Sequence, residues 1–168
     1  MSKEELKQII LQVYEQQKLK ENEIIMMRYW YHTFVPSLPT PKDEDLFAVA
    51  VNELIDEGKL IYESENLECL RLTELGMKDL YLNSKSVCDI EEDILDYFRR
   101  LKLRATQCIA MRTFEQTYFF GLNPIEKKRY MDAINNLITK KYVIYQEEGL
   151  RSLILEPMGE VYIYSQND

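Results

Sequence analysis

The sequence repeats itself, and this repeat limits the possible folds more than any other feature. When the chain is displaced by 83 residues, residues 50–81 align without a gap on residues 133–164, and 12 of the 32 paired positions are identical. Ordinary residue usage would give about two identities. The match crosses helical, hairpin and loop patterns in the same order, which chance similarity between amphipathic helices would not produce. The chain therefore uses one structural unit twice.

The front of each half aligns at a slightly larger offset, 84 residues. The apolar positions of residues 6–28 then fall on those of residues 90–112. The change of offset places the loss of one residue in the second half, between Tyr118 and Pro124. The polar residues 83–86 form the seam. We therefore expect two small domains, residues 1–83 and residues 84–168, which suits the chain length.

Local signals predict the same elements in each unit. Capping-box patterns begin first helices at Ser2 and Ser86, and cap-then-proline pairs begin third helices at residues 40–41 and 123–124. Asn22 and Thr106 are candidate N-caps of second helices that would carry residues 24–25 and 108–109. Hairpins follow, with strands at residues 59–62 and 70–72 in one unit and 142–145 and 152–155 in the other. Short helices at residues 73–81 and 157–164 close the units, so the fold class is α+β and helix-rich.

A passage after the first hairpin carries a family resemblance. It reads Leu70-Arg71-Leu72-Thr73-Glu74-Leu75-Gly76. This resembles the L-x-L-T-x-x-G segment that follows the wing in many winged helix-turn-helix regulators of bacteria and archaea. The resemblance implies tandem winged-helix domains, each with three helices, a β-hairpin wing and a short terminal helix. Winged helices serve both as DNA readers and as protein-binding modules. Residues 34–39 depart from the pattern, because they make a longer connection than a standard helix-turn-helix has.

In DNA-binding members of the family, the third helix enters the major groove and the wing touches phosphates. The net charge of −8 argues against a generally basic nucleic-acid coat protein. Counting by half, residues 1–83 carry 9 basic and 16 acidic residues, and residues 84–168 carry 12 and 13. The first unit has carboxylates at residues 43–45 and at Glu63 and Glu65, which would repel phosphates. The second unit supplies the candidate DNA contacts: Lys102, Arg104, Arg112, Lys127, Lys128 and Arg129.

Aromatic residues cluster at residues 29–35 of the first unit and at residues 118–120 of the second. Seven consecutive positions on a helix, such as residues 29–35, cannot all face a core, so part of this run should meet another surface. The interpretations are packing between the two units, a homodimer or partner surface, and base stacking. The candidate surface residues are Tyr29, Trp30, Tyr31, Phe34, Tyr118, Phe119 and Phe120.

Other function classes lack their sequence signals. The single histidine, His32, and three scattered cysteines do not match a zinc site or a nucleophilic triad. Phosphate-binding and nucleophile-elbow motifs do not occur. We therefore expect no enzyme, cofactor or metal. An apolar run of membrane-spanning length and a signal peptide are also missing, which predicts a cytoplasmic protein without membrane contact.

Two functions stay open at this point. The first is a DNA-binding or transcription-related protein in which the second unit contacts double-stranded DNA and the first serves as scaffold or dimerisation module. The alternative is a protein–protein interaction adaptor or scaffold, built on acidic tandem winged helices, that binds no DNA. Binding of duplex DNA that weakens steeply with salt would distinguish them.

Overall fold

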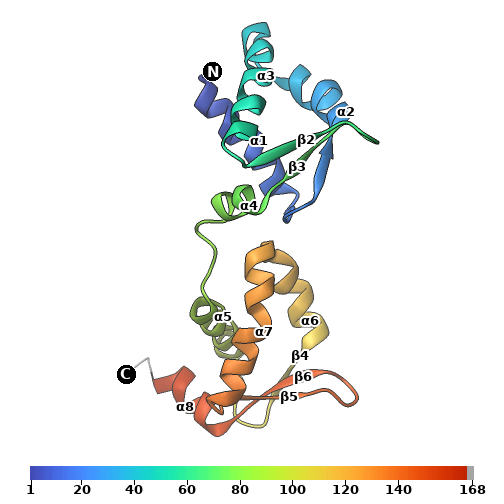
Figure 1. Ribbon diagram of the computed structural model, residues 1–168. Helices are drawn as coiled ribbons and strands as arrows, with labels where there is room; N and C mark the ends of the chain where they lie inside the picture. Colours follow the sequence, from blue (N-terminus) through green and yellow to red (C-terminus); the bar gives the residue numbers. More distant parts are fainter. Residues whose placement is uncertain (166–168) are drawn as a thin grey trace. The chain divides into compact units, whose positions relative to one another are not determined.

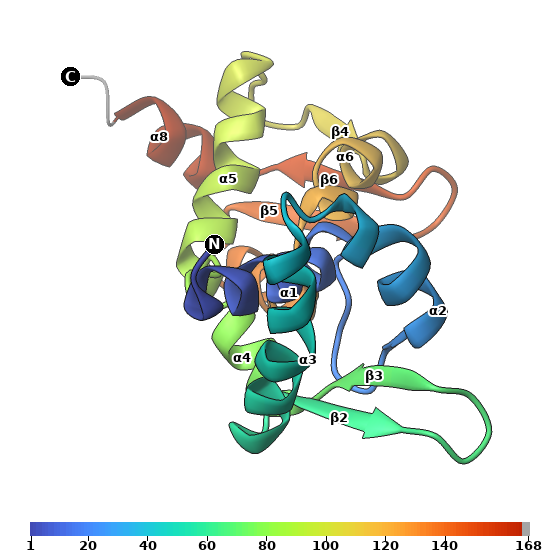
Figure 2. The same cartoon turned by 90° about the horizontal axis from the view of Figure 1, so that it is seen from above.

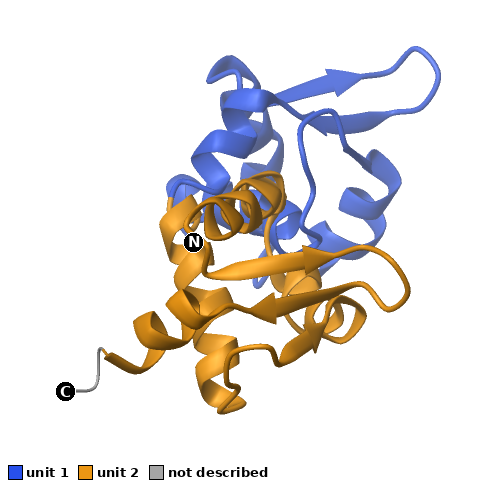
Figure 3. Ribbon diagram, turned by 90° about the horizontal axis from the view of Figure 1, so that it is seen from below, with its two compact units in different colours: residues 1–82 blue, residues 83–168 orange. Residues whose placement is uncertain are grey.

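A computed structural model of the chain describes residues 1–165. The protein is α+β and about 59% helical, with two small three-stranded antiparallel sheets among the described residues (Figure 1). The chain divides into two compact units, Met1–Leu82 and Asn83–Asp168, coloured separately in Figure 3. The boundary between Leu82 and Asn83 lies one residue before the expected boundary between residues 83 and 84. None of the helices in residues 1–165 is long and apolar enough to cross a membrane.

Both units have the same element order, except that the first has an additional short helical turn, η1. The first contains α1 (Lys3–Gln16), β1 (Ile24–Met26), α2 (Met27–Tyr29), η1 (Trp30–Phe34), η2 (Val35–Ser37), α3 (Pro41–Asp56), β2 (Leu60–Glu63), β3 (Cys69–Leu72) and α4 (Glu74–Leu80). The second contains α5 (Val87–Arg100), β4 (Cys108–Ala110), α6 (Met111–Thr117), η3 (Phe119–Gly121), α7 (Pro124–Thr139), β5 (Val143–Gln146), β6 (Ser152–Leu155) and α8 (Pro157–Ser165). In each unit the hairpin loop reaches beyond the helices (Figures 1 and 2).

The predicted helix starts of the first and third helices are confirmed. Ser2 caps α1 and Ser86 caps α5, each within a complete capping box. Thr40 and Asn123 cap α3 and α7 in the same way, each with proline at the first helical position. These short-range hydrogen bonds depend only on residues three apart, which is why the sequence pattern was sufficient to locate them.

The predicted second helices begin at the wrong place. Asn22 and Thr106 are not N-caps, because both have left-handed backbones, with φ of 66° and 72°. The residues after them form β1 and β4, which pair with the hairpins in the orders β1-β3-β2 and β4-β6-β5. Ile25 pairs with Leu70, and Ile109 pairs with Leu153. Backbone groups of these short segments are thus satisfied by pairing with the hairpin strands β3 and β6 instead of by a helical turn.

The extra residue of the first unit is accommodated in a π-helical turn. In η1 the N–H of Val35 donates to the carbonyl of Trp30, five residues earlier. At the same place in the second unit the N–H of Tyr118 donates to Phe114, four residues earlier. A π-turn inserts one residue into a helix. It therefore accounts for the change of repeat offset.

Each unit has its own aromatic core. Trp30 is fully buried and its ring lies 5.0 Å from Phe34 and 5.8 Å from Phe47. In the second unit, Phe114 occupies the corresponding position and stacks on Tyr118 at 5.1 Å. Trp30 and Phe114 contact rings on the first and third helices of their units. These contacts fix the positions of the helices that carry the surfaces described next.

Candidate interaction surfaces

Three of the candidate DNA contacts lie in the first turns of α7. The Lys127 ammonium lies over the Phe119 ring, 5.6 Å from its centroid. The Arg129 guanidinium donates to the carbonyl of Lys85 at 2.7 Å and so holds the segment before α5. Lys128 is exposed and has no ion pair among residues 1–165. One of the three cations is therefore fully available to a ligand.

The other three candidates lie near β4. Arg104 donates to the Glu160 carboxylate at 2.8 Å, although its own side chain is largely exposed. Glu160 also accepts from the Ala105 N–H at 2.7 Å, and this bond, with the Arg104 contact, lowers the pKa of Glu160. Lys102 lies in a left-handed turn, with φ of 55°, and Arg112 lies in the first turn of α6. Both are exposed and have no ion pair among the described residues.

The structure separates these cations into two groups. The first turns of α7 pack beside residues 84–85, just before α5 begins, through the Lys85 N–H to Glu126 bond at 2.9 Å. Lys102 and Arg104 follow the other end of α5. A helix of this length spans about 20 Å. The candidate residues therefore do not form one contiguous positive face.

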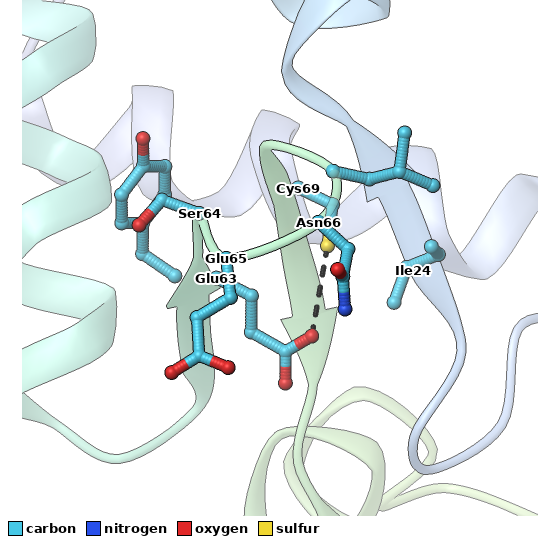
Figure 4. A pocket seen from close by; sticks show the side chains of 8 residues that line it. Ile24, Glu63, Ser64, Glu65, Asn66 and Cys69 are labelled. Carbon is cyan, nitrogen blue, oxygen red and sulfur yellow. Dashed lines mark hydrogen bonds between the residues drawn. The ribbon is translucent and has the colours of Figure 1, made fainter.

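The hairpin loops carry carboxylates in both units. Glu63 and Glu65 belong to the first loop region, and Glu147 and Glu148 belong to the second. Glu63 is paired with Arg71 at 2.7 Å, which lowers the pKa of Glu63. Figure 4 shows Glu63 and Glu65 pointing to the same side of the hairpin, with Ile24 on the neighbouring strand. A phosphate backbone would meet carboxylates at both hairpin loops.

The aromatic candidates divide into core and surface residues. Trp30 and Phe34 are buried, whereas Tyr29, Tyr118 and Phe119 are half-buried. The Tyr118 hydroxyl donates to Asp93 at 2.6 Å, and burial, followed by this bond, raises the pKa of Tyr118. Tyr31 and Phe120 keep 55% and 62% of their surface exposed. Most of the aromatic run therefore serves the core of its own unit.

Tyr31 borders a groove that sequence reasoning missed. The groove has a volume of about 380 Å³ and lies between η1, α3 and β2. Its other main lining residues are Ala48, Asn52, Ile55, Tyr62 and Glu68. A second hollow of about 550 Å³ shares Tyr62 and is lined by Ile24, Glu63, Glu65 and Cys69 (Figure 4).

A signal for this groove exists in the repeat alignment. Tyr31 falls on Glu115, and Glu68 falls on Arg151. In the second unit these two residues form an ion pair at 3.7 Å. The paired change from tyrosine and glutamate to glutamate and arginine indicates that the two positions lie close together in both units.

Chemistry-bearing groups outside these surfaces are sparse. Among residues 1–165, no group of His, Cys, Asp and Glu side chains is arranged to hold a metal ion. Cys69 is buried, and Cys88 and Cys108 are exposed free thiols. Burial raises the pKa of the Cys69 thiol. His32 is exposed on η1.

Comparison with known proteins gave no match: no family model, curated protein or solved structure matches the chain.

Proposed function

We propose that this protein is a non-catalytic protein–protein interaction adaptor built from two winged-helix units. The order of elements in each unit, helix, strand, helix, helix and hairpin, supports the winged-helix assignment. So does the antiparallel packing of the first strand on the hairpin. A fold of this kind is compatible with several functions. The side chains on the surface therefore have to distinguish an adaptor from a DNA-binding protein.

The chemistry of the third-helix and hairpin face carries the proposal. DNA readers of this fold place cations on this face, because phosphate contacts supply most of the affinity. Here the first unit presents tyrosines, aliphatic side chains and Glu68 on the same face. In the second unit, Arg104 and Arg129 already donate to protein oxygens, and the hairpin loop carries Glu147 and Glu148. This composition suits a protein partner better than a phosphate backbone.

A peptide-display selection with the intact chain tests this function. A random library without charge bias is selected on the immobilised chain, and enriched peptides are synthesised and measured by fluorescence anisotropy. An adaptor is expected to bind the selected peptides saturably, with one peptide bound at each site. If none of the enriched peptides binds the chain in solution, the adaptor function is contradicted. Light scattering on the same sample would report whether a second copy of the chain is the partner.

DNA binding by the second unit is the second candidate. Lys102, Arg112 and Lys128 are exposed and have no ion pair among the described residues, so they remain open to phosphates. If this function holds, anisotropy of generic duplex DNA should show binding that weakens steeply from low to moderate salt. Lys127→Glu with Lys128→Glu should then abolish it, whereas Lys20→Glu with Lys42→Glu, the same charge change in the first unit, should leave it intact. The adaptor function predicts no binding even at low salt.

A further inference from the structure

The groove of the first unit has apolar walls and one charged side chain among the residues that line it. Tyr31 is 55% exposed and Tyr62 is 45% exposed, and they border it from η1 and β2. Ala48 and Ile55 contribute from the same side of α3, two turns apart. Partly exposed rings in a concave surface provide large contact area at a low cost in conformational entropy. Such a surface suits an apolar anchor side chain.

Glu68 supplies the charge. Desolvation, followed by the neighbouring Glu68 carboxylate, raises the pKa of Tyr62, so the two side chains lie together. Within residues 1–165, no lysine or arginine pairs with Glu68. None of the described residues that line this groove or the adjoining hollow is Lys, Arg or His. Of the two carboxylates that border the hollow, Glu63 is paired with Arg71, and Glu65 has no ion pair among the described residues. The combined surface is therefore apolar with a negative edge at Glu65 and Glu68.

In the second unit, two side chains of opposite charge occupy the same position. There Glu115 and Arg151 stand at the places of Tyr31 and Glu68 and pair with each other. The backbone at Glu68 and Arg151 is equivalent, because the Met27 N–H donates to the Glu68 carbonyl at 2.8 Å and the Met111 N–H to the Arg151 carbonyl at 2.9 Å. Tyr31 lies in the π-helical turn η1, whereas Glu115 lies in α6. The first unit lacks the arginine that neutralises the site in the second.

We infer that the groove bordered by Tyr31, Tyr62 and Glu68 binds a peptide segment of a partner protein in which an aromatic or aliphatic anchor is flanked by lysine or arginine. This rests on the proposed adaptor function and assigns its binding site to the first unit. The anchor lies on the α3 and tyrosine side chains, and the cation pairs with the Glu68 carboxylate, which stands where the second unit has Arg151. The excess of acidic residues in residues 1–83, 16 against 9 basic, favours the approach of such a segment.

The test uses labelled synthetic peptides and the intact chain. One peptide has a leucine or phenylalanine anchor with flanking lysines, and its partner has glutamates in place of the lysines. The lysine peptide is expected to bind and the glutamate peptide to bind about tenfold more weakly or not at all. Tyr31→Glu with Glu68→Arg, which introduces the residues of the second unit, should weaken lysine-peptide binding by about tenfold or more. Glu15→Arg on α1 makes the same charge change as Glu68→Arg outside the groove and should leave binding unchanged.

The reciprocal exchange gives an independent gain-of-binding test. Glu115→Tyr with Arg151→Glu should create a second site, so that the stoichiometry rises from one lysine peptide per chain to two. Circular dichroism checks that each variant folds. Equal binding of the two peptides, or unchanged binding after the Tyr31 and Glu68 exchange, would overturn this inference. If display-selected peptides still bind in that case, the adaptor function stands and only the groove assignment fails.

Discussion

Two buried tyrosine hydroxyls, one in each unit, differ in hydrogen bonding. The Tyr14 hydroxyl of α1 donates to the carbonyl of Leu70 at 3.0 Å and is fully buried. The Tyr130 hydroxyl of α7 is buried without a protein hydrogen-bond partner in the described part of the chain. In the repeat, each tyrosine falls on a phenylalanine, Phe98 and Phe47 respectively. Both positions therefore tolerate the phenylalanine ring.

We expect Tyr14→Phe and Tyr130→Phe to have opposite consequences. Tyr14→Phe should lower the free energy of unfolding by about 1 kcal/mol, because it leaves the Leu70 carbonyl without this donor. Tyr130→Phe should leave stability unchanged or raise it by up to about 1 kcal/mol, because it removes an unsatisfied polar group. Urea unfolding followed by circular dichroism measures both. A clear loss of stability in Tyr130→Phe would mean that its hydroxyl has a partner after all.

At the scale of elements, the first and third helices of each unit are joined by an ion pair of opposite polarity. In the first unit, the buried Lys7 of α1 pairs with Glu57 at the end of α3. In the second, the buried Glu91 of α5 pairs with Lys140 at the end of α7. The repeat alignment places Lys7 on Glu91 and Glu57 on Lys140. The exchange of both charges at once preserves the attraction between the helices.

This inversion predicts a rescue by the second substitution. Lys7→Glu alone should lower the free energy of unfolding by about 2 kcal/mol or more, because it places a buried carboxylate beside Glu57. Adding Glu57→Lys should recover most of that loss, since the double variant has the polarity of the second unit. A double-mutant cycle in urea measures the coupling. If the double variant is as unstable as the sum of the single ones, the pair does not act as a unit.

At the scale of the whole molecule, the chain has two compact units that each contain a close backbone approach at a glycine. A Cβ on Gly76 would lie 2.3 Å from the Lys59 carbonyl oxygen, and a Cβ on Gly159 would lie 2.2 Å from that of Tyr142. Both glycines open the short terminal helix of their unit, and the repeat aligns them. Only a residue without a side chain lets that helix pack against the hairpin.

Gly159→Ala should destabilise the second unit by about 2 kcal/mol and leave the first unaffected, because the overlap is local to one core. Hydrogen exchange with mass spectrometry resolves this: protection should fall in peptides from α5, α7 and β6 and stay constant in peptides from α1, α3 and β3. Gly76→Ala should give the mirror result. Equal loss of protection in both units would show that they unfold as one.

The sequence alone was sufficient for the number of units, the order of most elements and the capped helix starts. Each of these depends on signals within a few residues, such as Ser2 with Glu5, or on the repeat itself. The sequence assigned residues 24–25 to a helix, however, because a three-residue strand has no period that distinguishes it from a helical turn.

The remaining features depend on which distant residues meet in space. β1 is a strand because Ile25 pairs with Leu70. Arg104 is engaged because the fold brings Glu160 beside it, although Glu160 lies 56 positions later in the chain. The groove at Tyr31, Tyr62 and Glu68 likewise joins three separate segments. Such contacts are set by packing of the whole unit. Charge counts along the sequence indicated where cations occur, and the folded chain decided which of them are already neutralised and where an uncompensated carboxylate faces an apolar groove.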